Sequence, residues 1–597
     1  MNAPGGKNGP TKAGTAHPGK TAVLSFLFRS TALQSKRLVA DTLWRDRPLK
    51  NGNDEEFPFV VAESVSPLRT NTDSRERYLQ VGKIENLRLA CGQIHRKVLA
   101  PGDTFSFWRQ VGAPWRLRGF KKGREVREGC VIPTTGGGLC QLSGSLLQVA
   151  ISAGCELIER HRHSALPADV LYDPSRDATI FWNYVDLRFR SPIPILFECH
   201  LTANELVVRI RAKSPKPSVF RIEAACMQHV PLRIEASCYT CFKTACLRQC
   251  NPPEEEKAGS YKTAFLVDEP QAELNAYVNC SVRSGDHLLT RNSSGTELRF
   301  EGDHSRLVTK AFPLFRLRRA WKLRSAVLRG GTVAKAHFEL AQLLARTYCK
   351  HVDYDVEHIC LAQTLLPHVW KAGSLAGRSF DVLMYRLPIN VLEEKLQRAT
   401  ALYPYSKTLE EFRAPKWFAE AEEEALRAAR SIVTPHPQIA ALFKNATRIP
   451  WDMPSREIKA VSGDREKDLV VFFGPTIARK GAYAVREIVK QLGFELTVVG
   501  PELEGPDFWR GLPVRRIELA SLPWDRIHTV LQPALFEFWP RHLLRAQAAG
   551  SHLLISDCCG IEENHEKGVY HVPFGDPASA VAIMETLLAN RGKALCV

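Results

Sequence analysis

The sequence predicts a multidomain chain: an α+β domain, then a small cysteine-rich connector, then an α/β region with two parallel sheets. The 597 residues are too many for a single hydrophobic core. The apolar fraction of 44% and the charged fraction of 24% are those of globular proteins. From about residue 320, apolar strand-like runs alternate with longer helical runs, which is typical of wound parallel sheets.

Charge and cysteine content restrict the partners and the compartment. A net charge of +17 favours anionic partners, such as phosphorylated substrates, acidic lipid or nucleic acid, without choosing among them. The 16 cysteines are spread over a long chain, whereas disulfide scaffolds are short and dense in cysteine. No stretch approaches the roughly 18 apolar residues of a spanning helix. We therefore expect a cytoplasmic protein that could bind peripherally at the inner face of the membrane.

The first half of the chain divides into a tail and a domain. Residues 1–54 form a basic segment that we expect to be partly disordered, because its start is rich in Gly, Pro, Lys and Thr without periodicity. Residues 55–215 form the α+β domain, with strand-like runs at 193–201 and 205–210. Residues 143–155 have the apolar spacing of a helix.

A glycine-rich turn precedes this helix. The run Gly136-Gly137-Gly138 should deliver Cys140 to the helix start, where backbone amides and the helix dipole favour a thiolate. With His163 and Asp177 downstream, the order is that of a cysteine nucleophile, a base and an orienting carboxylate. Such a site could perform acyl transfer or hydrolysis. The alternatives are a buried, unreactive Cys140 with local hydrogen bonds around it, or His161 as the base.

These motifs resemble the VanW family over roughly residues 60–215. The resemblance rests on Asn86, Val111-Gly112 and four runs, which are residues 101–107, 136–143, 161–164 and 177–179. The family takes its name from an accessory protein of glycopeptide-antibiotic resistance clusters. The resemblance implies a domain type and little about its chemistry.

A cysteine cluster marks the predicted connector, residues 216–310. Cys238, Cys241, Cys246 and Cys250 are separated by two, four and three residues, which is close to the spacing of a compact zinc knuckle. A structural zinc ion would hold together a segment that has little core of its own. The alternative is a chance cluster of buried thiols. Few aromatic and basic residues flank the cluster, so no specific nucleic-acid partner is expected.

The C-terminal half is predicted to contain two α/β units. A polar break at residues 450–464 divides the region into residues 311–455 and residues 456–597. Because buried parallel strands are short apolar runs, we place strands at six positions, which are residues 381–385, 431–434, 469–474, 495–500, 527–531 and 553–556.

The second unit contains a basic loop and an acidic segment. Gly474 ends a strand-like run, and Arg479 and Lys480 follow in the loop before a helix. Residues 530–540 contain Glu537, and Glu562 follows a later glycine. The pattern resembles the donor half of retaining glycosyltransferases with the GT-B fold, which consists of two Rossmann-like domains.

The resemblance implies roles for these residues. The loop would hold the diphosphate of a nucleotide sugar with Gly474, Arg479 and Lys480, since two cations at a helix start stabilise the departing diphosphate. Glu537 would contact the donor sugar, and Glu562 would belong to the same site. The ribose-binding glutamate expected eight positions after Glu537 is replaced by Arg545. The alternative for the basic loop is a solvated turn.

The first unit offers a weaker match. Gly330-Gly331 before a helical run resembles the acceptor-side loop of these enzymes. Residues 310–329 interleave aromatic and basic side chains, which could rest on anionic lipid or pack as a linker between domains.

Together these resemblances imply a glycosyltransferase of the hexosyltransferase type. It would transfer a sugar from a UDP, GDP or ADP donor to a glycan or lipid-linked acceptor in envelope or polysaccharide metabolism. The alternatives are a cysteine-dependent acyl transferase or hydrolase in the first domain, acting on peptide or envelope material, and a non-catalytic scaffold.

Overall fold

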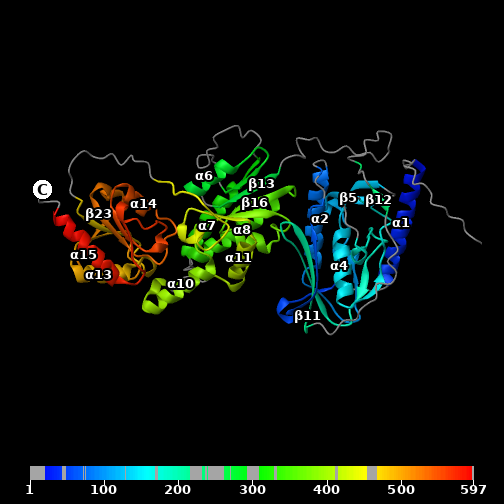
Figure 1. Ribbon diagram of the computed structural model, residues 1–597, viewed down its shortest axis with the longest axis horizontal. Coiled ribbons are helices and arrows are strands. Elements are labelled where there is room, and N and C mark those ends of the chain that lie inside the picture. The colour runs from blue at the N-terminus through cyan, green and yellow to red at the C-terminus, as the bar shows by residue number, and fades with distance from the viewer. Residues whose placement is uncertain are drawn as a thin grey trace, which may run out of the picture. The chain divides into compact units, whose positions relative to one another are not determined.

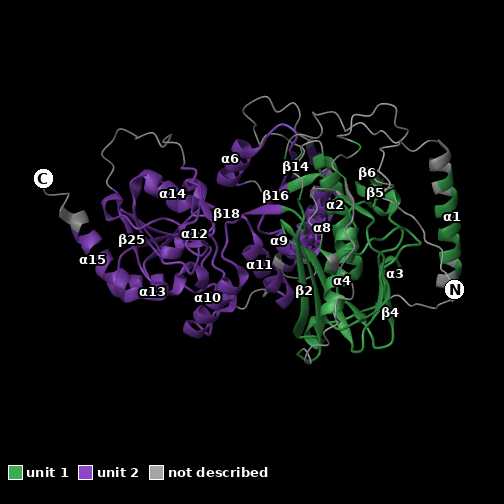
Figure 2. Cartoon of the chain, turned by 45° about the vertical axis from the view of Figure 1, so that its right-hand side comes forward, with its two compact units in different colours: residues 1–261, 353–357, 376–378 green, residues 262–352, 358–375, 379–597 purple. Residues whose placement is uncertain are grey.

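The computed structural model describes most of the chain. The described residues are 20–43, 49–70, 73, 76–127, 130–167, 173–215, 232–234, 238, 261–268, 271–291, 308–328, 333–409, 414–453 and 467–593. They form two compact units, distinguished by colour in Figure 2. Unit 1 comprises residues 1–261, 353–357 and 376–378, and unit 2 comprises residues 262–352, 358–375 and 379–597.

Unit 1 is built on an antiparallel sheet of five strands. Their order is β1-β3-β10-β11-β2. The long pair in the middle exchanges hydrogen bonds along its whole length, from Ile195 opposite Ala212 to Leu201 opposite Leu206. The strands are β1 (Lys50–Asn51), β2 (Phe59–Pro67), β3 (Lys97–Leu99), β10 (Ile195–Leu201) and β11 (Glu205–Ala212).

Two helices pack against this sheet, α2 (Arg77–Ile94) and α4 (Cys140–Ser152) (Figure 1). Each buries residues at helical spacing, such as Leu87 and Ile94 on α2 and Leu146 on α4, in one core with the sheet. The helix predicted at 143–155 is therefore present, and it begins at Cys140.

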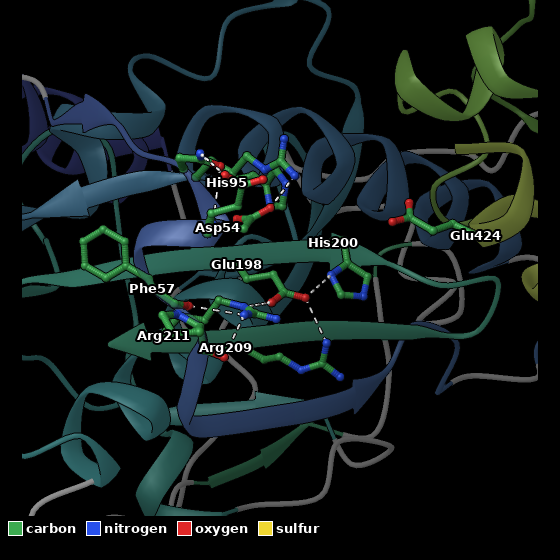
Figure 3. Close-up of polar contacts among 12 residues, drawn as sticks. Asp54, Phe57, His95, Glu198, His200, Arg209, Arg211 and Glu424 are labelled. Atoms are coloured by element: carbon green, nitrogen blue, oxygen red, sulfur yellow. Dashed lines mark hydrogen bonds and ion pairs between the residues drawn. The ribbon is translucent and has the colours of Figure 1, made fainter. Parts of the chain in front are cut away.

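The opposite face of the long hairpin carries an ion-pair cluster. Glu198 on β10 accepts hydrogen bonds from Arg209 at 2.9 Å and Arg211 at 2.6 Å on β11, and His200 lies 3.7 Å from the same carboxylate (Figure 3). Glu198 and Arg209 are directly opposite in the register. Cross-strand pairs of opposite charge stabilise a hairpin by about 0.2–1 kcal/mol each, so this cluster favours the observed register.

Smaller elements complete unit 1. They are a three-stranded sheet in the order β4-β9-β7, a hairpin of β5 and β6, and a parallel pair of β8 and β12. The bounds are α1 (Lys20–Leu43), β4 (Thr104–Ser106), α3 (Phe107–Val111), β5 (Lys122–Arg127), β6 (Cys130–Thr135), β7 (Glu156–Glu159), β8 (Ala165–Pro167), β9 (Arg188–Arg190) and β12 (Leu232–Ile234).

Unit 2 contains two parallel sheets in series. The first has the order β15-β14-β13-β16-β17-β18-β19 and the second β22-β21-β20-β23-β24-β25. When the strands of each sheet are numbered in chain order, the first six positions of both sheets are 3-2-1-4-5-6, which is the Rossmann strand order. The fold class expected from the sequence is confirmed by this topology, together with the antiparallel sheets of unit 1.

The elements of the first parallel sheet begin at residue 262. They are β13 (Lys262–Val267), α6 (Ala272–Ser281), β14 (His287–Thr290), β15 (Val308–Ala311), α7 (Pro313–Leu328), α8 (Val333–His351), β16 (Val356–Ala362), α9 (Leu366–Lys371), β17 (Ser379–Leu383), α10 (Ile389–Leu402), α11 (Lys416–Ala428), β18 (Ser431–Thr434), α12 (Pro437–Ala440) and β19 (Ala446–Arg448).

The second parallel sheet occupies the end of the chain. Its elements are β20 (Leu469–Phe473), α13 (Ala482–Leu492), β21 (Leu496–Val499), β22 (Val514–Ile517), β23 (Ile527–Gln532), α14 (Arg541–Ala548), β24 (His552–Ile555), β25 (Val569–His571) and α15 (Pro577–Lys593).

The boundary between connector and first parallel sheet was wrong in the sequence prediction. Strands β13, β14 and β15 lie within or across the predicted connector 216–310, yet they are three of the seven strands of the first sheet. β14 and β15 have four residues each and β15 is not uniformly apolar, so their buried-strand pattern is weak, whereas the apolar end of β13 is a signal that the prediction missed. The first parallel sheet therefore starts near residue 262 instead of 311.

None of the helices in the described ranges is both long and apolar enough to cross a membrane.

Candidate active sites

The loop after β20 is the centre of the first candidate site. It passes through a short 3₁₀ turn (Ala478–Lys480) into α13, and Gly481 joins the two with φ of +86°. A Cβ atom on Gly481 would lie 2.4 Å from the Pro533 carbonyl oxygen, so only glycine fits this approach of two backbones. The amide of Leu535 also donates to the Arg479 carbonyl at 2.8 Å. The loop is thereby fixed against the segment that follows β23.

This attachment brings Lys480 and Glu537 together. They form an ion pair between side chains that are 20% and 11% exposed. The amide of Trp539 donates to the Glu537 carboxylate at 3.3 Å, and the Gln532 amide group does so at 3.4 Å. The sequence placed both residues in one site, and they are in contact. Arg479 is exposed on the same turn.

A cavity of about 460 Å³ opens at the carboxyl ends of β20, β21 and β22. In parallel sheets of this order, ligands bind outside the carboxyl ends of the strands near the switch between the first and fourth strands. Gly474, expected at the donor site, lines this cavity, and its amide donates to the Val499 carbonyl at 2.7 Å. The rings of Phe473 and His542, which are stacked at 5.1 Å, also line it.

Two other residues of the predicted donor site have different neighbours. Arg545, which replaces the expected glutamate, stacks its guanidinium over the Trp524 ring at 4.3 Å. Glu562 is 63% exposed and pairs with Arg448 of the first parallel sheet. Sequence spacing gave no sign of either partner.

The predicted acceptor-side loop, Gly330-Gly331, lies outside the described residues and stays a prediction. The first strand of this sheet, β13, is followed by Asp268, which accepts a hydrogen bond from the Thr364 hydroxyl at 2.9 Å. Asp268 was not identified from the sequence, although it follows directly after the apolar end of β13.

The second candidate site lies in unit 1 around Cys140. Asn86, buried on α2, donates to the carbonyls of Lys121 and Gly137 at 3.0 and 2.9 Å, which anchors the glycine-rich turn. A Cβ atom on Gly137 would lie 2.4 Å from the Gly123 backbone, so this turn needs glycine. The turn leads directly into α4, whose first residue is Cys140.

The structure brings Cys140, His163 and Asp177 together. His163 Nδ1 lies 2.7 Å from Asp177 Oδ1, and the backbone amide of His163 donates to the same oxygen at 3.0 Å. Cys140 Sγ lies 4.0 Å from the Thr179 hydroxyl oxygen, and the nearby His163 ring acts to lower the pKa of the Cys140 thiol. His161, the competing base, is exposed and lies 3.3 Å from Glu159 instead.

The pKa values of the three groups reflect this contact. Burial acts to raise the pKa of the Cys140 thiol, but hydrogen bonds from His163, the Ile180 amide and the Thr179 hydroxyl, together with the His163 charge, lower it overall. Burial opposes charge on His163, yet its hydrogen bonds with Asp177 and Cys140 raise its pKa to about 10. For Asp177, burial is outweighed by the His163 hydrogen bonds, and its pKa is lowered. The arrangement favours a thiolate–imidazolium pair.

The zinc prediction falls mostly outside the described residues, which exclude Cys241, Cys246 and Cys250. Cys238 is buried, and its amide donates to the Val131 carbonyl at 2.9 Å. Among the described residues, no group of His, Cys, Asp or Glu could hold a metal ion. A zinc ion at the four cysteines stays a prediction.

Residues 82–211 match the family described as VanW like protein, and we call this part of unit 1 the VanW-like domain for that similarity. The chain is 25% identical over 185 residues to the vancomycin B-type resistance protein VanW of Enterococcus faecalis, covering 30% of this chain and 66% of that protein. It is 29% identical over 153 residues to the uncharacterized protein YoaR of Bacillus subtilis, covering 25% and 50%. The chain therefore spans between half and about two thirds of the length of these relatives.

Unit 2 is similar to solved structures of sugar-transferring enzymes. Sucrose-phosphate synthase from Thermosynechococcus elongatus is 14% identical, with 56% of this chain and 91% of that chain covered and a TM-score of 0.38. An alpha,alpha-trehalose-phosphate synthase (UDP-forming) from Burkholderia vietnamiensis is 10% identical, with 55% of this chain and 92% of that chain covered and a TM-score of 0.34. The lipopolysaccharide outer core galactosyltransferase WaaB is 14% identical, with 55% of this chain and 90% of that chain covered and a TM-score of 0.32. The fold assignment itself rests on the two sheets of Rossmann order in series.

Proposed function

We propose that unit 2 is a glycosyltransferase of the hexosyltransferase type, which transfers a sugar from a nucleoside-diphosphate donor to a glycan or lipid-linked acceptor of the cell envelope. One observation carries the proposal. The loop after the first strand of the second sheet holds Lys480 beside Glu537, at the edge where parallel sheets bind ligands, and a cavity opens at the same edge.

Each group has a part in this reaction. The cavity of about 460 Å³ has the volume of a small-molecule site and would take the nucleoside, with the His542 ring available for stacking on the base. Arg479 and Lys480 would contact the diphosphate and stabilise the negative charge that it gains as the glycosidic bond breaks. Glu537 would accept hydrogen bonds from hydroxyl groups of the sugar.

The ion pair between Lys480 and Glu537 prepares the site for this donor. Without a ligand, each charge is the other's partner in a largely buried place. A diphosphate would bind Lys480 from the open side, and Lys480 would then bridge phosphate and carboxylate. Arg545, engaged with Trp524, is not a carboxylate and would leave the ribose hydroxyls to other acceptors.

We further propose that the protein works in the cytoplasm, at the inner face of an anionic membrane. The 16 cysteines are spread over a long chain, unlike the dense cysteines of small disulfide scaffolds, which supports a reducing compartment. On α7, Leu317 and Trp321 are 69% and 67% exposed at helical spacing, and Arg318 and Arg324 are exposed beside them. Such a helix could place a lipid-linked acceptor near the site.

The direct test is donor turnover by the full chain. UDP-, GDP- and ADP-glucose are incubated with it, and the release of nucleoside diphosphate is measured with water or added glycan as acceptor. We expect release from one donor class, a loss of at least ten-fold in Lys480→Met, and no change in Lys490→Met, which alters an exposed lysine of α13, the helix that follows Lys480. No release from any donor would favour the scaffold alternative.

A further inference from the structure

Two charged side chains line the cavity of about 460 Å³ in the second parallel sheet and have no part in holding a diphosphate or a sugar. They are Arg516 and Glu518. Arg516 lies on β22, and Glu518 is the first residue after that strand ends at Ile517. Both therefore lie at the carboxyl edge of the sheet, where parallel sheets of this order bind ligands. Charged groups at such a place can select among ligands by hydrogen bonding.

Arg516 is held in place by a buried carboxylate. Its guanidinium forms an ion pair with Glu502, whose side chain is only 5% exposed, while 59% of the Arg516 side chain is accessible. Glu502 is itself fixed, because its backbone pairs with Thr476 in the loop after β20. A guanidinium has five N–H donors, so those that Glu502 does not use can bind a ligand. Arg516 thus presents donors at a defined point of the cavity wall.

Glu518 has a different environment. It is exposed, and none of the residues that the structure describes donates a hydrogen bond to its carboxylate. Its backbone is fixed, because its carbonyl accepts a hydrogen bond from the Ser521 amide at 2.9 Å across a short 3₁₀ turn (Leu519–Ser521). An ionised carboxylate only accepts hydrogen bonds, and its two oxygens can accept from two neighbouring donors at once. The wall therefore carries one acceptor group and one donor group.

An aromatic surface in the same cavity suits a planar base. The Phe473 ring stacks with the rings of His542 at 5.1 Å and Trp524 at 5.6 Å. Burial lowers the pKa of His542, although the charge of Glu537 acts in the opposite direction. A neutral imidazole can stack on a neutral base without burying a charge. Because the charges of Glu537 and Lys480 both act on this ring, the cavity adjoins the ion pair assigned to the donor.

We propose that the donor is a sugar linked to guanosine diphosphate, and that Glu518 and Arg516 select its guanine base. The proposal rests on the function proposed for unit 2 and names the donor class of that site. Glu518 accepts hydrogen bonds from the ring N1–H and the exocyclic amine of guanine. Arg516 donates to the O6 oxygen, and the His542 ring stacks on the face of the base.

The other bases of the common nucleotide sugars fit this wall less well. On guanine, N1–H and the exocyclic amine are neighbouring donors, which one carboxylate can accept together. Uracil has a single N–H between two carbonyl groups, whose lone pairs repel a carboxylate. Adenine has its amine beside a ring nitrogen that is an acceptor. Arg516 could donate to an acceptor on any of the three bases, so the choice is made by Glu518.

The test measures the affinity of the full chain for GDP, inosine diphosphate, UDP and ADP by isothermal titration calorimetry. Inosine diphosphate differs from GDP only in lacking the exocyclic amine, so the comparison changes the contact with Glu518 and leaves the diphosphate unaltered. A bidentate contact to a base discriminates by roughly five- to a hundred-fold. We expect GDP to bind about five-fold or more tightly than inosine diphosphate, and about ten-fold or more tightly than UDP and ADP.

A matched pair of glutamate variants separates base selection from folding. Glu518→Gln replaces one acceptor oxygen by a donor amide, and should lower the affinity for GDP about ten-fold without weakening that for UDP. Glu495→Gln alters an exposed glutamate just before β21, at the amino edge of the sheet, and should change neither affinity.

The outcomes distinguish this proposal from sugar transfer itself. UDP or ADP binding as tightly as GDP, equal affinities for GDP and inosine diphosphate, or a Glu518→Gln variant that matches the parent chain would each overturn guanine selection and leave sugar transfer standing. Binding of none of the four nucleotides would overturn both.

Discussion

Loss of Lys480 should destabilise the second parallel sheet in a way that depends on Glu537. The pair is neither fully buried nor exposed, with side chains 20% and 11% accessible. Exposed pairs contribute about 0–1 kcal/mol, whereas removing one partner of a buried pair costs about 3–5 kcal/mol. In Lys480→Met the Glu537 carboxylate would keep only contacts of 3.3 and 3.4 Å, which are long for hydrogen bonds. We therefore expect a loss of about 2–3 kcal/mol.

The partner variant should cost less. Glu537→Gln retains an acceptor oxygen for the Trp539 amide and leaves an ammonium that is closer to solvent, so about 1 kcal/mol is expected. The double variant should lose less than the sum of the two, by a coupling energy of about 1–2 kcal/mol. Lys490→Met on the exposed face of α13 should change stability by less than about 0.5 kcal/mol.

Local stability is the right measurement, because a chain of several domains does not unfold in one step. Hydrogen exchange of peptides covering β23 and α14 reports the opening free energy of this sheet. Full additivity of the two single variants would mean that no coupling exists, and the contact between Lys480 and Glu537 would then be refuted.

Three further predictions concern other parts of the molecule. Gly481→Ala should destabilise the loop after β20, because a Cβ atom would lie 2.4 Å from the Pro533 carbonyl oxygen and φ is +86°. We expect the opening free energy of this loop, measured by hydrogen exchange, to fall by about 1–3 kcal/mol, and nucleotide binding to weaken. An unchanged exchange rate of the loop amides would refute this. His163→Asn should be more destabilising at pH 6 than at pH 10.5. The pKa of His163 is raised to about 10, so its contribution is fully present below its ordinary value of 6.5 and is lost as the pH rises through 10. Urea unfolding of the parent chain and the variant at pH 6 and pH 10.5 measures this effect. A stability difference that does not shrink at pH 10.5 would contradict the prediction. Finally, Leu317→Ser/Trp321→Ser should abolish flotation with anionic liposomes, whereas a parent chain that stays in the soluble fraction would reject the membrane contact.

The sequence predicted the second half of the fold best where strands are buried on both faces. The run at residues 469–474 reads as a strand because β20 lies between neighbours in the sheet and is covered on both sides, so nearly every position is apolar. At the edges this signal fails. β15 is the outermost strand of its sheet, and its apolar pattern is correspondingly weak.

The candidate sites show the same division. Chain order placed Cys140 at a helix start, because a glycine-rich turn and an apolar helical run are local features. It could not choose between His163 and His161, which are two residues apart, since only the three-dimensional path of the loop after β7 decides which ring meets Asp177. The pairing of Arg545 with Trp524 was likewise invisible, because it joins two segments through the fold.

A thermal-shift screen measures whether the second parallel sheet binds a nucleotide. The full chain is heated with UDP, GDP, ADP and their sugar conjugates, since a ligand at a hundred times its dissociation constant stabilises the site by about 2.7 kcal/mol. We expect stabilisation by one nucleotide class that persists in Lys490→Met and disappears in Arg479→Ala/Lys480→Ala. No stabilisation by any nucleotide, or a shift that survives loss of both basic residues, would contradict it.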